Sequence, residues 1–128
     1  MTTGGVRYAR VGEASIAYRV IGSEGPYFLD ITSVFPGILA AEHSVTRGYW
    51  ERISRFARVV VFDVQGSGRS DPLPLGIAAS VERQAEQAIA VFTSAGIEHA
   101  YVGGHGCCPA PRSGFWPRAR QCLRTRPR

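Results

Sequence analysis

The 128-residue chain contains no lysine, has no cysteine before residue 107 and has no acidic residue after Glu98. Without cysteines, the first 106 residues cannot form the disulfide framework typical of small secreted domains. No stretch approaches the ~20 apolar residues that a membrane-spanning helix needs. Residues 1–10 lack the apolar core of a secretion signal. We therefore expect a cytoplasmic protein without membrane attachment.

The basic excess is confined to one end of the chain. Fifteen arginines against ten acidic residues give a formal net charge of +5, which by itself would favour a polyanionic partner. Residues 1–106 carry nine arginines and ten acidic residues, whereas residues 107–128 carry six arginines and no acidic residue. Nucleic-acid binding through this tail is one alternative, with Phe115 and Trp116 as its stacking aromatics. The irregular arginine spacing argues against nucleic acid as the partner.

The cysteines do not predict a metal site. Cys107 and Cys108 are adjacent and Cys122 follows fourteen residues later, with His105 nearby. This spacing differs from the paired C-x2-C and H-x3-H spacings of structural zinc sites. We assign no metal ligand, no cofactor and no cofactor-binding residue.

Strands and helices are predicted to alternate along the first 106 residues. Runs rich in β-branched and aromatic residues predict strands at residues 8–11, 15–20, 27–31, 59–62 and 100–103. Apolar residues at helical spacing predict helices at residues 44–57 and 81–95, the second with Ser80 as N-cap and Gly96 as its end. An initial hairpin followed by this alternation predicts an α/β fold with a mostly parallel sheet and flanking helices.

The helix expected at residues 44–57 has a defined apolar stripe. Val45, Tyr49, Ile53 and Ala57 recur every four residues, which predicts that they face the core. Ser44 is the candidate N-cap, and Glu51 stands four residues before Arg55, a spacing typical of a helical ion pair.

The segment after the strand at residues 59–62 is rich in turn-forming residues. Asp63 is followed by Gly66 and Gly68, which permit positive φ and a tight turn. Such a turn could bind phosphate, but Asp71 stands where a dinucleotide-binding G-x-G-x-x-G has its third glycine. A nucleotide site is therefore only weakly indicated.

With its surroundings, this segment resembles the D-x-x-G-x-G-x-S turn after the fourth strand of the α/β-hydrolase superfamily. The resemblance covers residues 7 to about 106 and is strongest to actinobacterial hydrolase-like domains that occur alone or fused to adenylate or guanylate cyclases. It implies the N-terminal part of that fold and a turn that is structural rather than catalytic. Gln65 stands where the family commonly has arginine.

The catalytic residues that this resemblance implies are missing. Such enzymes carry a nucleophilic serine on a G-x-S-x-G elbow after the fifth strand. If the elbow is aligned on Gly104-His105, the nucleophile position is Gly106; if it is aligned on Pro109, the position is His105. A thiol of Cys107 or Cys108 is an alternative nucleophile, although Pro109 and Pro111 would interrupt the helix that has to follow.

The rest of the catalytic constellation is also incomplete. Thr32-Ser33 replaces the His-Gly or Pro-Gly usual in the family at the start of its oxyanion loop. His99 is expected in a surface turn, and His43 in a loop before a helix. The triad acid and histidine of the superfamily follow later strands, so residues 1–128 hold no assigned catalytic residue.

We therefore interpret residues 1–106 as a partial α/β-hydrolase-like domain with an incomplete sheet. Residues 107–128 form an irregular basic tail, either disordered or the product of a frameshift in GC-rich DNA. The intact parent is expected to hydrolyse an ester or amide bond of a small molecule, and the fragment to be inactive. The alternative is a non-catalytic sensor or interaction module of a cyclase or regulator. The exposed edge of the strand at residues 100–103 favours self-association.

Overall fold

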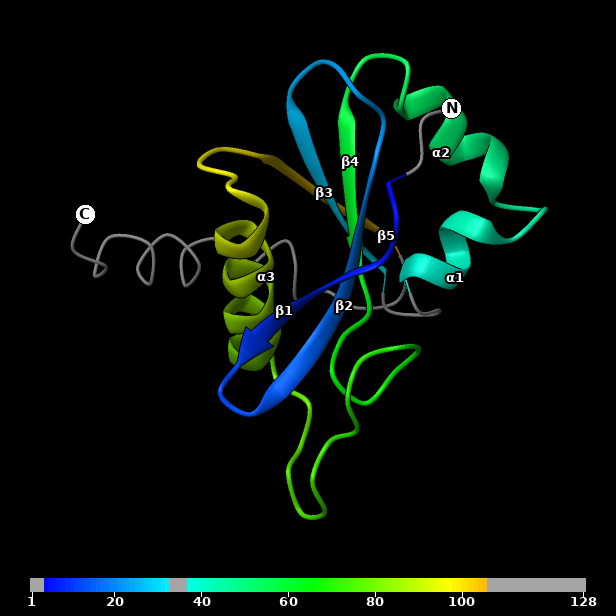
Figure 1. Cartoon of the computed structure of the whole chain (residues 1–128). Helices are drawn as coiled ribbons and strands as arrows, with labels where there is room; N and C mark the ends of the chain where they lie inside the picture. Colours follow the sequence, from blue (N-terminus) through cyan, green and yellow to red (C-terminus); the bar gives the residue numbers. More distant parts are fainter. Residues whose placement is uncertain (1–3, 33–36, 106–128) are drawn as a thin grey trace.

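The computed structural model describes residues 4–32 and 37–105 (Figure 1). Several features predicted from the sequence therefore lie outside the described residues. They are Ser33 of the expected oxyanion loop, the elbow position Gly106, the three cysteines, and the whole tail at residues 107–128 with Phe115 and Trp116.

Five strands form one mixed sheet. They are β1 (Arg7–Val11), β2 (Ala14–Ile21), β3 (Tyr27–Thr32), β4 (Arg58–Phe62) and β5 (Tyr101–His105), in the spatial order β1-β2-β4-β3-β5. β1 and β2 form the predicted antiparallel hairpin, and β2 pairs antiparallel with β4. β3 pairs in parallel with both β4 and β5. The predicted α/β sheet is confirmed, with β5 extending two residues beyond the predicted end.

β4 is the central strand that its composition predicts. Val59, Val60 and Val61 are fully buried. A strand in the middle of a layered sheet is covered on both faces, so an uninterrupted run of β-branched residues suits it.

α3 (Val81–Ala95) covers one face of the sheet and packs mainly against β1 (Figure 1). The Ser80 side chain accepts a hydrogen bond from the Arg83 N–H, and Gly96 ends the helix in the left-handed conformation with φ 71°. The predicted cap and end are both confirmed. The predicted stripe is confirmed at its centre, where Ala85, Ala88 and Phe92 are buried.

The region between β3 and β4 corrects the predicted helix at residues 44–57. It holds two short helices, α1 (Gly37–Glu42) and α2 (Arg47–Ile53), on the opposite face from α3. The predicted apolar stripe is wrong in its first half, because Val45 precedes α2 and is 82% exposed, and Tyr49 is 43% exposed. Its second half is confirmed, since Ile53 packs against the core and Ala57 is buried. Trp50 is buried in their place, with its indole N–H donating to the Ala40 carbonyl at 3.1 Å.

The predicted cap and ion pair of this helix also differ. Thr46, not Ser44, is the N-cap residue of α2, and its side chain makes no capping hydrogen bond. The ion pair of Glu51 is formed with Arg47, four residues before it, at 2.8 Å. The prediction paired Glu51 with Arg55, four residues after it. The observed pair has the same spacing of four residues, but the arginine precedes the glutamate.

Two apolar clusters lie on the two faces of the sheet. The cluster beneath α3 includes Ile16, Leu29, Val60 and Phe92. The cluster beneath α1 and α2 includes Ile21, Ile38, Val59 and Trp50. Side chains alternate between faces along each strand, so neighbouring residues of β4 contribute to different clusters.

Candidate functional site

The carboxyl ends of β3, β4 and β5 lie at the same end of the sheet. Thr32 of β3 pairs in register with His105 of β5, and Asp63 follows β4 directly. In open α/β sheets, ligands bind outside the carboxyl ends of parallel strands, where the strand order reverses. This end of the sheet is therefore the candidate functional site.

Asp63 is the buried charged residue of this site, with 1% of its surface exposed. Its Oδ1 accepts a hydrogen bond from the Ile38 N–H at 3.0 Å, and its Oδ2 accepts one from the Arg69 N–H at 2.9 Å. The carboxylate thus holds the first turn of α1 and the turn after β4 against each other. Both oxygens are used within the fold, so Asp63 stabilises the site and is not presented to a substrate.

The start of α1 also lies very close to the β4 backbone. A Cβ added at Gly37 would come within 2.7 Å of the Phe62 carbonyl oxygen. Only glycine permits this approach. The loop expected to bind an oxyanion therefore leads into a helix whose position is fixed by Asp63 and by the glycine.

The end of the turn is joined to β2. The Ser70 hydroxyl accepts from the Ala17 N–H at 2.8 Å and donates to the Asp63 carbonyl. Asp71 accepts from the Ser15 N–H through its side chain at 2.8 Å and donates its own N–H to the Ser15 carbonyl at 3.0 Å. These bonds join β2 to a turn more than fifty residues later in the chain, so the end of the turn is held along the first residues of β2.

Five N–H groups of this turn donate hydrogen bonds within the protein. Both glycines have the predicted positive φ, 91° at Gly66 and 51° at Gly68. The donors are the N–H groups of Gly66, Ser67, Arg69, Ser70 and Asp71, and each bonds to an oxygen of the fold. A phosphate-binding loop needs such groups directed at the ligand. The nucleotide alternative is therefore not supported, and the turn has the structural role that the resemblance implies.

Gln65, which stands where the family commonly has arginine, connects the turn to α3. Its N–H donates to the buried Gln87 side chain at 2.9 Å, and its own amide donates to the Pro72 carbonyl at 3.1 Å. A cavity of about 20 Å³ lies beside these groups. This volume admits about one water molecule, whereas small-molecule sites have ~300–1,000 Å³. The cavity is too small to be a substrate pocket.

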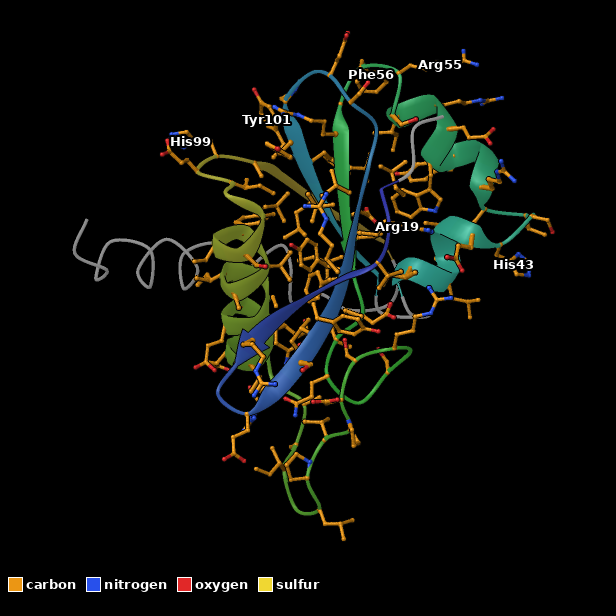
Figure 2. The ribbon with its side chains drawn as sticks, in the orientation of Figure 1. Arg19, His43, Arg55, Phe56, His99 and Tyr101 are labelled. Atoms are coloured by element: carbon orange, nitrogen blue, oxygen red, sulfur yellow. The ribbon has the colours of Figure 1, made fainter. Side chains whose placement is uncertain are left out.

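His43 and His99 lie on opposite sides of the molecule (Figure 2). His43 is exposed between α1 and α2, and its Nδ1 accepts from the Val45 N–H at 3.3 Å. His99 is exposed just before β5. Both predicted locations are confirmed. The structure does not bring the two histidines together, and neither forms a hydrogen bond with Asp63, whose carboxylate bonds are those to Ile38 and Arg69.

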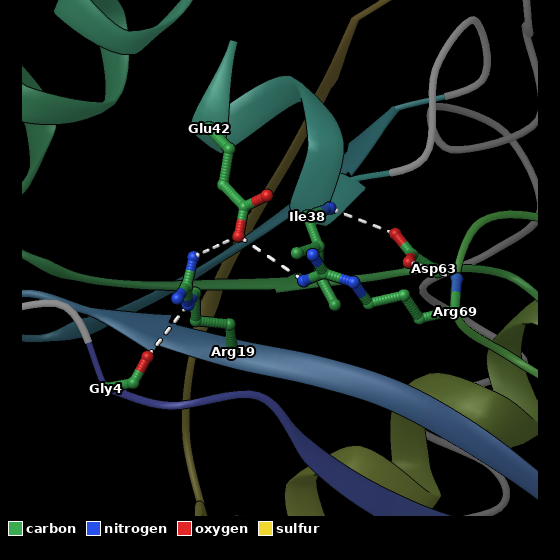
Figure 3. A network of polar contacts seen from close by, with 6 residues as sticks. All are labelled: Gly4, Arg19, Ile38, Glu42, Asp63 and Arg69. Carbon is green, nitrogen blue, oxygen red and sulfur yellow. Dashed lines mark hydrogen bonds and ion pairs between the residues drawn. The ribbon is translucent and has the colours of Figure 1, made fainter.

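A charged cluster crosses the outside of this region (Figure 3). Glu42 at the end of α1 accepts from Arg19 of β2 at 2.7 Å and from Arg69 of the turn at 3.3 Å. The Arg19 Nε also donates to the Gly4 carbonyl at 2.8 Å. Two arginines therefore neutralise one carboxylate while connecting β2, α1 and the turn. The sequence analysis missed this cluster, because the partners lie 23 and 27 residues apart and share no local pattern.

A second buried carboxylate lies within the sheet. Asp30 of β3 is 1% exposed and lies on the face covered by α1 and α2. Burial of Tyr49, together with the negative charge of Asp30, raises the pKa of the Tyr49 hydroxyl above its usual value of 10.0. The Tyr49 ring also contacts Trp50 edge to face, with ring centroids 4.9 Å apart.

Within residues 4–32 and 37–105, no group of three or more histidine, cysteine, aspartate or glutamate side chains could hold a metal ion. In the same part of the chain, no helix has both the length and the apolar character needed to cross a bilayer. The described part of the candidate site is thus a set of structural hydrogen bonds around Asp63.

The sequence matches no family model, and no curated protein matches it. Solved hydrolase structures share its fold. A proline iminopeptidase-related protein from Thermus thermophilus has a TM-score of 0.68 and 26% identity, over 98% of this chain and 41% of its own. A hydrolase from Pseudomonas aeruginosa has a TM-score of 0.66 and 21% identity, over 79% of this chain and 36% of its own. An enol-lactonase from Burkholderia xenovorans has a TM-score of 0.64 and 21% identity, over 77% of this chain and 36% of its own.

These comparisons confirm the predicted fold class. The five-stranded mixed sheet with flanking helices corresponds to part of the α/β-hydrolase fold. The chain spans about two fifths of the length of these structures, or less.

Proposed function

We propose that this chain is the N-terminal, scaffold-forming part of an α/β-hydrolase-like protein. The complete protein hydrolyses an ester, amide or related bond of a small molecule by nucleophilic catalysis. The 128 residues by themselves are inactive. The support for the parent activity is the hydrolase fold, together with the structural turn around Asp63 that the resemblance led us to expect.

One observation carries the proposed inactivity. The described part of β5 runs to His105, and the two alignments of the elbow put the nucleophile position at Gly106 or at His105. The nucleophile of this fold occupies the sharp turn directly after that strand. Neither glycine nor histidine supplies a hydroxyl or a thiol. No acidic residue follows Glu98, so the order serine, acid, histidine cannot be completed within this sequence.

The cysteines do not provide a substitute. Cys107 and Cys108 are followed by Pro109 and Pro111. The helix after an elbow presents its first N–H groups to the developing oxyanion, and a proline lacks this donor. Two prolines within three residues therefore oppose both the helix and the oxyanion site that a cysteine nucleophile would need.

The DNA beyond codon 106 tests the proposal. We expect another reading frame to encode a serine elbow, then a helix, and a downstream aspartate and histidine. A gene joined in that frame should yield an esterase that loses activity when the elbow serine is changed to alanine. If neither of the other frames encodes these elements, the proposed hydrolase parent is rejected.

The second candidate function is a non-catalytic interaction module joined to a nucleotide cyclase. The lack of a serine at either aligned nucleophile position, Gly106 or His105, favours it, because a module that only binds a partner does not need a nucleophile. An intact cyclase frame downstream of the hydrolase-like segment would support this candidate. A free-standing hydrolase frame would exclude it.

A further inference from the structure

We propose that a second copy of this chain binds at β5, so that the sheets of two molecules join through an antiparallel pair of β5 strands. This inference does not depend on the proposed hydrolase activity. β5 is the last strand of the sheet order, and among residues 4–32 and 37–105 it pairs only with β3. One edge of β5 therefore carries no strand from the described part of the chain.

The composition of β5 leaves this edge unprotected. The strand consists of Tyr101, Val102, Gly103, Gly104 and His105, so it contains no arginine, no acidic residue and no proline. Natural sheets protect their edges with charges, prolines, bulges or a covering element, because an open edge pairs readily with another strand. Gly103 and Gly104 also allow a second backbone to approach closely.

The opposite edge of the same sheet is protected. β1 carries Arg7 and Arg10, both exposed, and α3 packs against it. Figure 1 shows α3 beside β1. Among residues 4–32 and 37–105, the sheet therefore has one protected edge, at β1, and one edge without a partner strand, at β5.

The side chains at the β5 edge suit a partner strand. Tyr101 is 69% exposed, a large fraction for an aromatic residue in a strand (Figure 2). A partner strand would cover its ring, and cross-strand aromatic contacts stabilise a strand pair by about 0.2–1 kcal/mol each. On the inner side, the Phe28 ring already lies across Gly103.

Charge and symmetry favour a second copy as the occupant. Two β5 strands placed antiparallel bring no like charges opposite each other, because neither strand carries a charge with histidine neutral. Such a pair is related by a twofold axis and uses both open edges. The remaining edges are the two β1 strands with their arginines, so the assembly ends at a dimer. With Gly103 on the axis, Tyr101 lies opposite residue 105.

The small size of the contact favours a weak, reversible dimer. A pair of five-residue strands buries less than the ~1,200 Å² of a standard protein interface. We therefore expect a dissociation constant on the order of micromolar.

Sedimentation velocity of the full 128-residue chain, over about a hundredfold concentration range around this value, tests the proposal. We expect a concentration-dependent shift from the 13.9 kDa monomer to a dimer. Tyr101→Lys should weaken the dimer at least about tenfold by placing a charge at the edge. Tyr8→Lys is the matched control, because Tyr8 is 54% exposed on the opposite edge strand, and it should leave dimerisation unchanged.

Hydrogen exchange gives a second measurement that needs no variant. Backbone amides of residues 101–105 should exchange more slowly in the dimer than in the monomer, whereas those of β1 should not change. The proposal is overturned if the chain stays monomeric at every concentration. It is also overturned if the chain does not self-associate and its β5 pairs only with a strand of another protein. It is also overturned by open-ended oligomers, or by equal effects of Tyr8→Lys and Tyr101→Lys.

Discussion

The Oδ1 atom of Asp63 accepts a hydrogen bond of 3.0 Å from the backbone N–H of Ile38, 25 residues earlier in the chain. This contact joins the end of β4 to the first turn of α1. A short helix has few intrahelical hydrogen bonds, and its first N–H groups need partners from elsewhere. Asp63 supplies the acceptor for the Ile38 N–H of α1, and its second carboxylate oxygen is the acceptor for the Arg69 N–H of the turn.

Replacing Asp63 should therefore destabilise the fold. Asp63→Ala leaves the buried Ile38 N–H without its acceptor and also removes the acceptor of Arg69, so we expect a loss of about 2–4 kcal/mol. Asp63→Asn should cost less, because its amide oxygen still accepts one of the two bonds. Urea unfolding at a fixed protein concentration measures both losses.

The control for Asp63 is an exposed carboxylate. Glu24→Gln removes the same charge from a surface loop and should change the free energy of unfolding by less than about 0.5 kcal/mol. Equal effects of Glu24→Gln and Asp63→Asn would show that net charge, and not the hydrogen bonds of Asp63, accounts for the loss.

A larger side chain at Gly103 should displace the Phe28 ring. A Cβ at this position would lie 2.6 Å from the Cζ atom of Phe28, closer than a Cβ contact allows. Because that atom is the far end of a half-buried side chain, Gly103→Ala should cost about 1 kcal/mol, the lower end of the range for overpacking. Gly48→Ala is the matched control. Gly48 lies in α2 with nothing within 4 Å of the added atom, so its alanine variant should gain about 0.5–1 kcal/mol from helix propensity.

A double variant separates the clash at Gly103 from a backbone effect. Phe28→Leu shortens the side chain that would collide, so Gly103→Ala should cost less in its presence than alone. Strict additivity of the two changes, measured by urea unfolding, would contradict the proposed contact.

Regular elements with a strong local pattern could be predicted from the sequence. β4 was predicted because four consecutive β-formers suit a strand covered on both faces, and α3 because Ser80 and Gly96 enclose an amphipathic repeat. The turn at Asp63 was predicted as structural from the resemblance. Its hydrogen bonds to Ser15, Ala17 and Ile38 bear out that role.

The helices between β3 and β4 could not be predicted correctly, for a physical reason. α1 spans only the six residues Gly37–Glu42, which is too short for a helical repeat to show in the sequence. Its position depends on Asp63, which comes later in the chain. The stripe containing Val45 and Tyr49 fitted a longer helix, but the turn at residues 43–46 rotates α2 so that Trp50 faces the core.

Tyr49 should make stability depend on pH in the alkaline range. Burial and the Asp30 charge raise its pKa in the folded state above 10.0, so the folded protein retains the proton at a pH where the unfolded chain has lost it. The contribution of Tyr49 is fully present below pH 10 and is lost as the pH rises through the raised folded-state value. The free energy of unfolding should thus fall above pH 10.

Tyr49→Phe isolates this contribution. The variant has no hydroxyl to ionise, so its free energy of unfolding should fall less steeply above pH 10 than that of the original protein. Asp30→Asn should reduce the difference between the two by removing the second cause of the raised pKa. Identical slopes for the original protein and Tyr49→Phe would contradict the assignment.

The hydrolysis of p-nitrophenyl esters by the purified 128-residue chain tests the central claim most directly. The chain forms part of the α/β-hydrolase fold, but the two alignments of the elbow give glycine (Gly106) or histidine (His105), and no serine, at the nucleophile position. We predict a rate indistinguishable from that of buffer, and no change in that rate on Cys107→Ser or Cys108→Ser. Turnover above buffer that disappears in either cysteine variant would contradict the account and show that the chain is itself a thiol hydrolase.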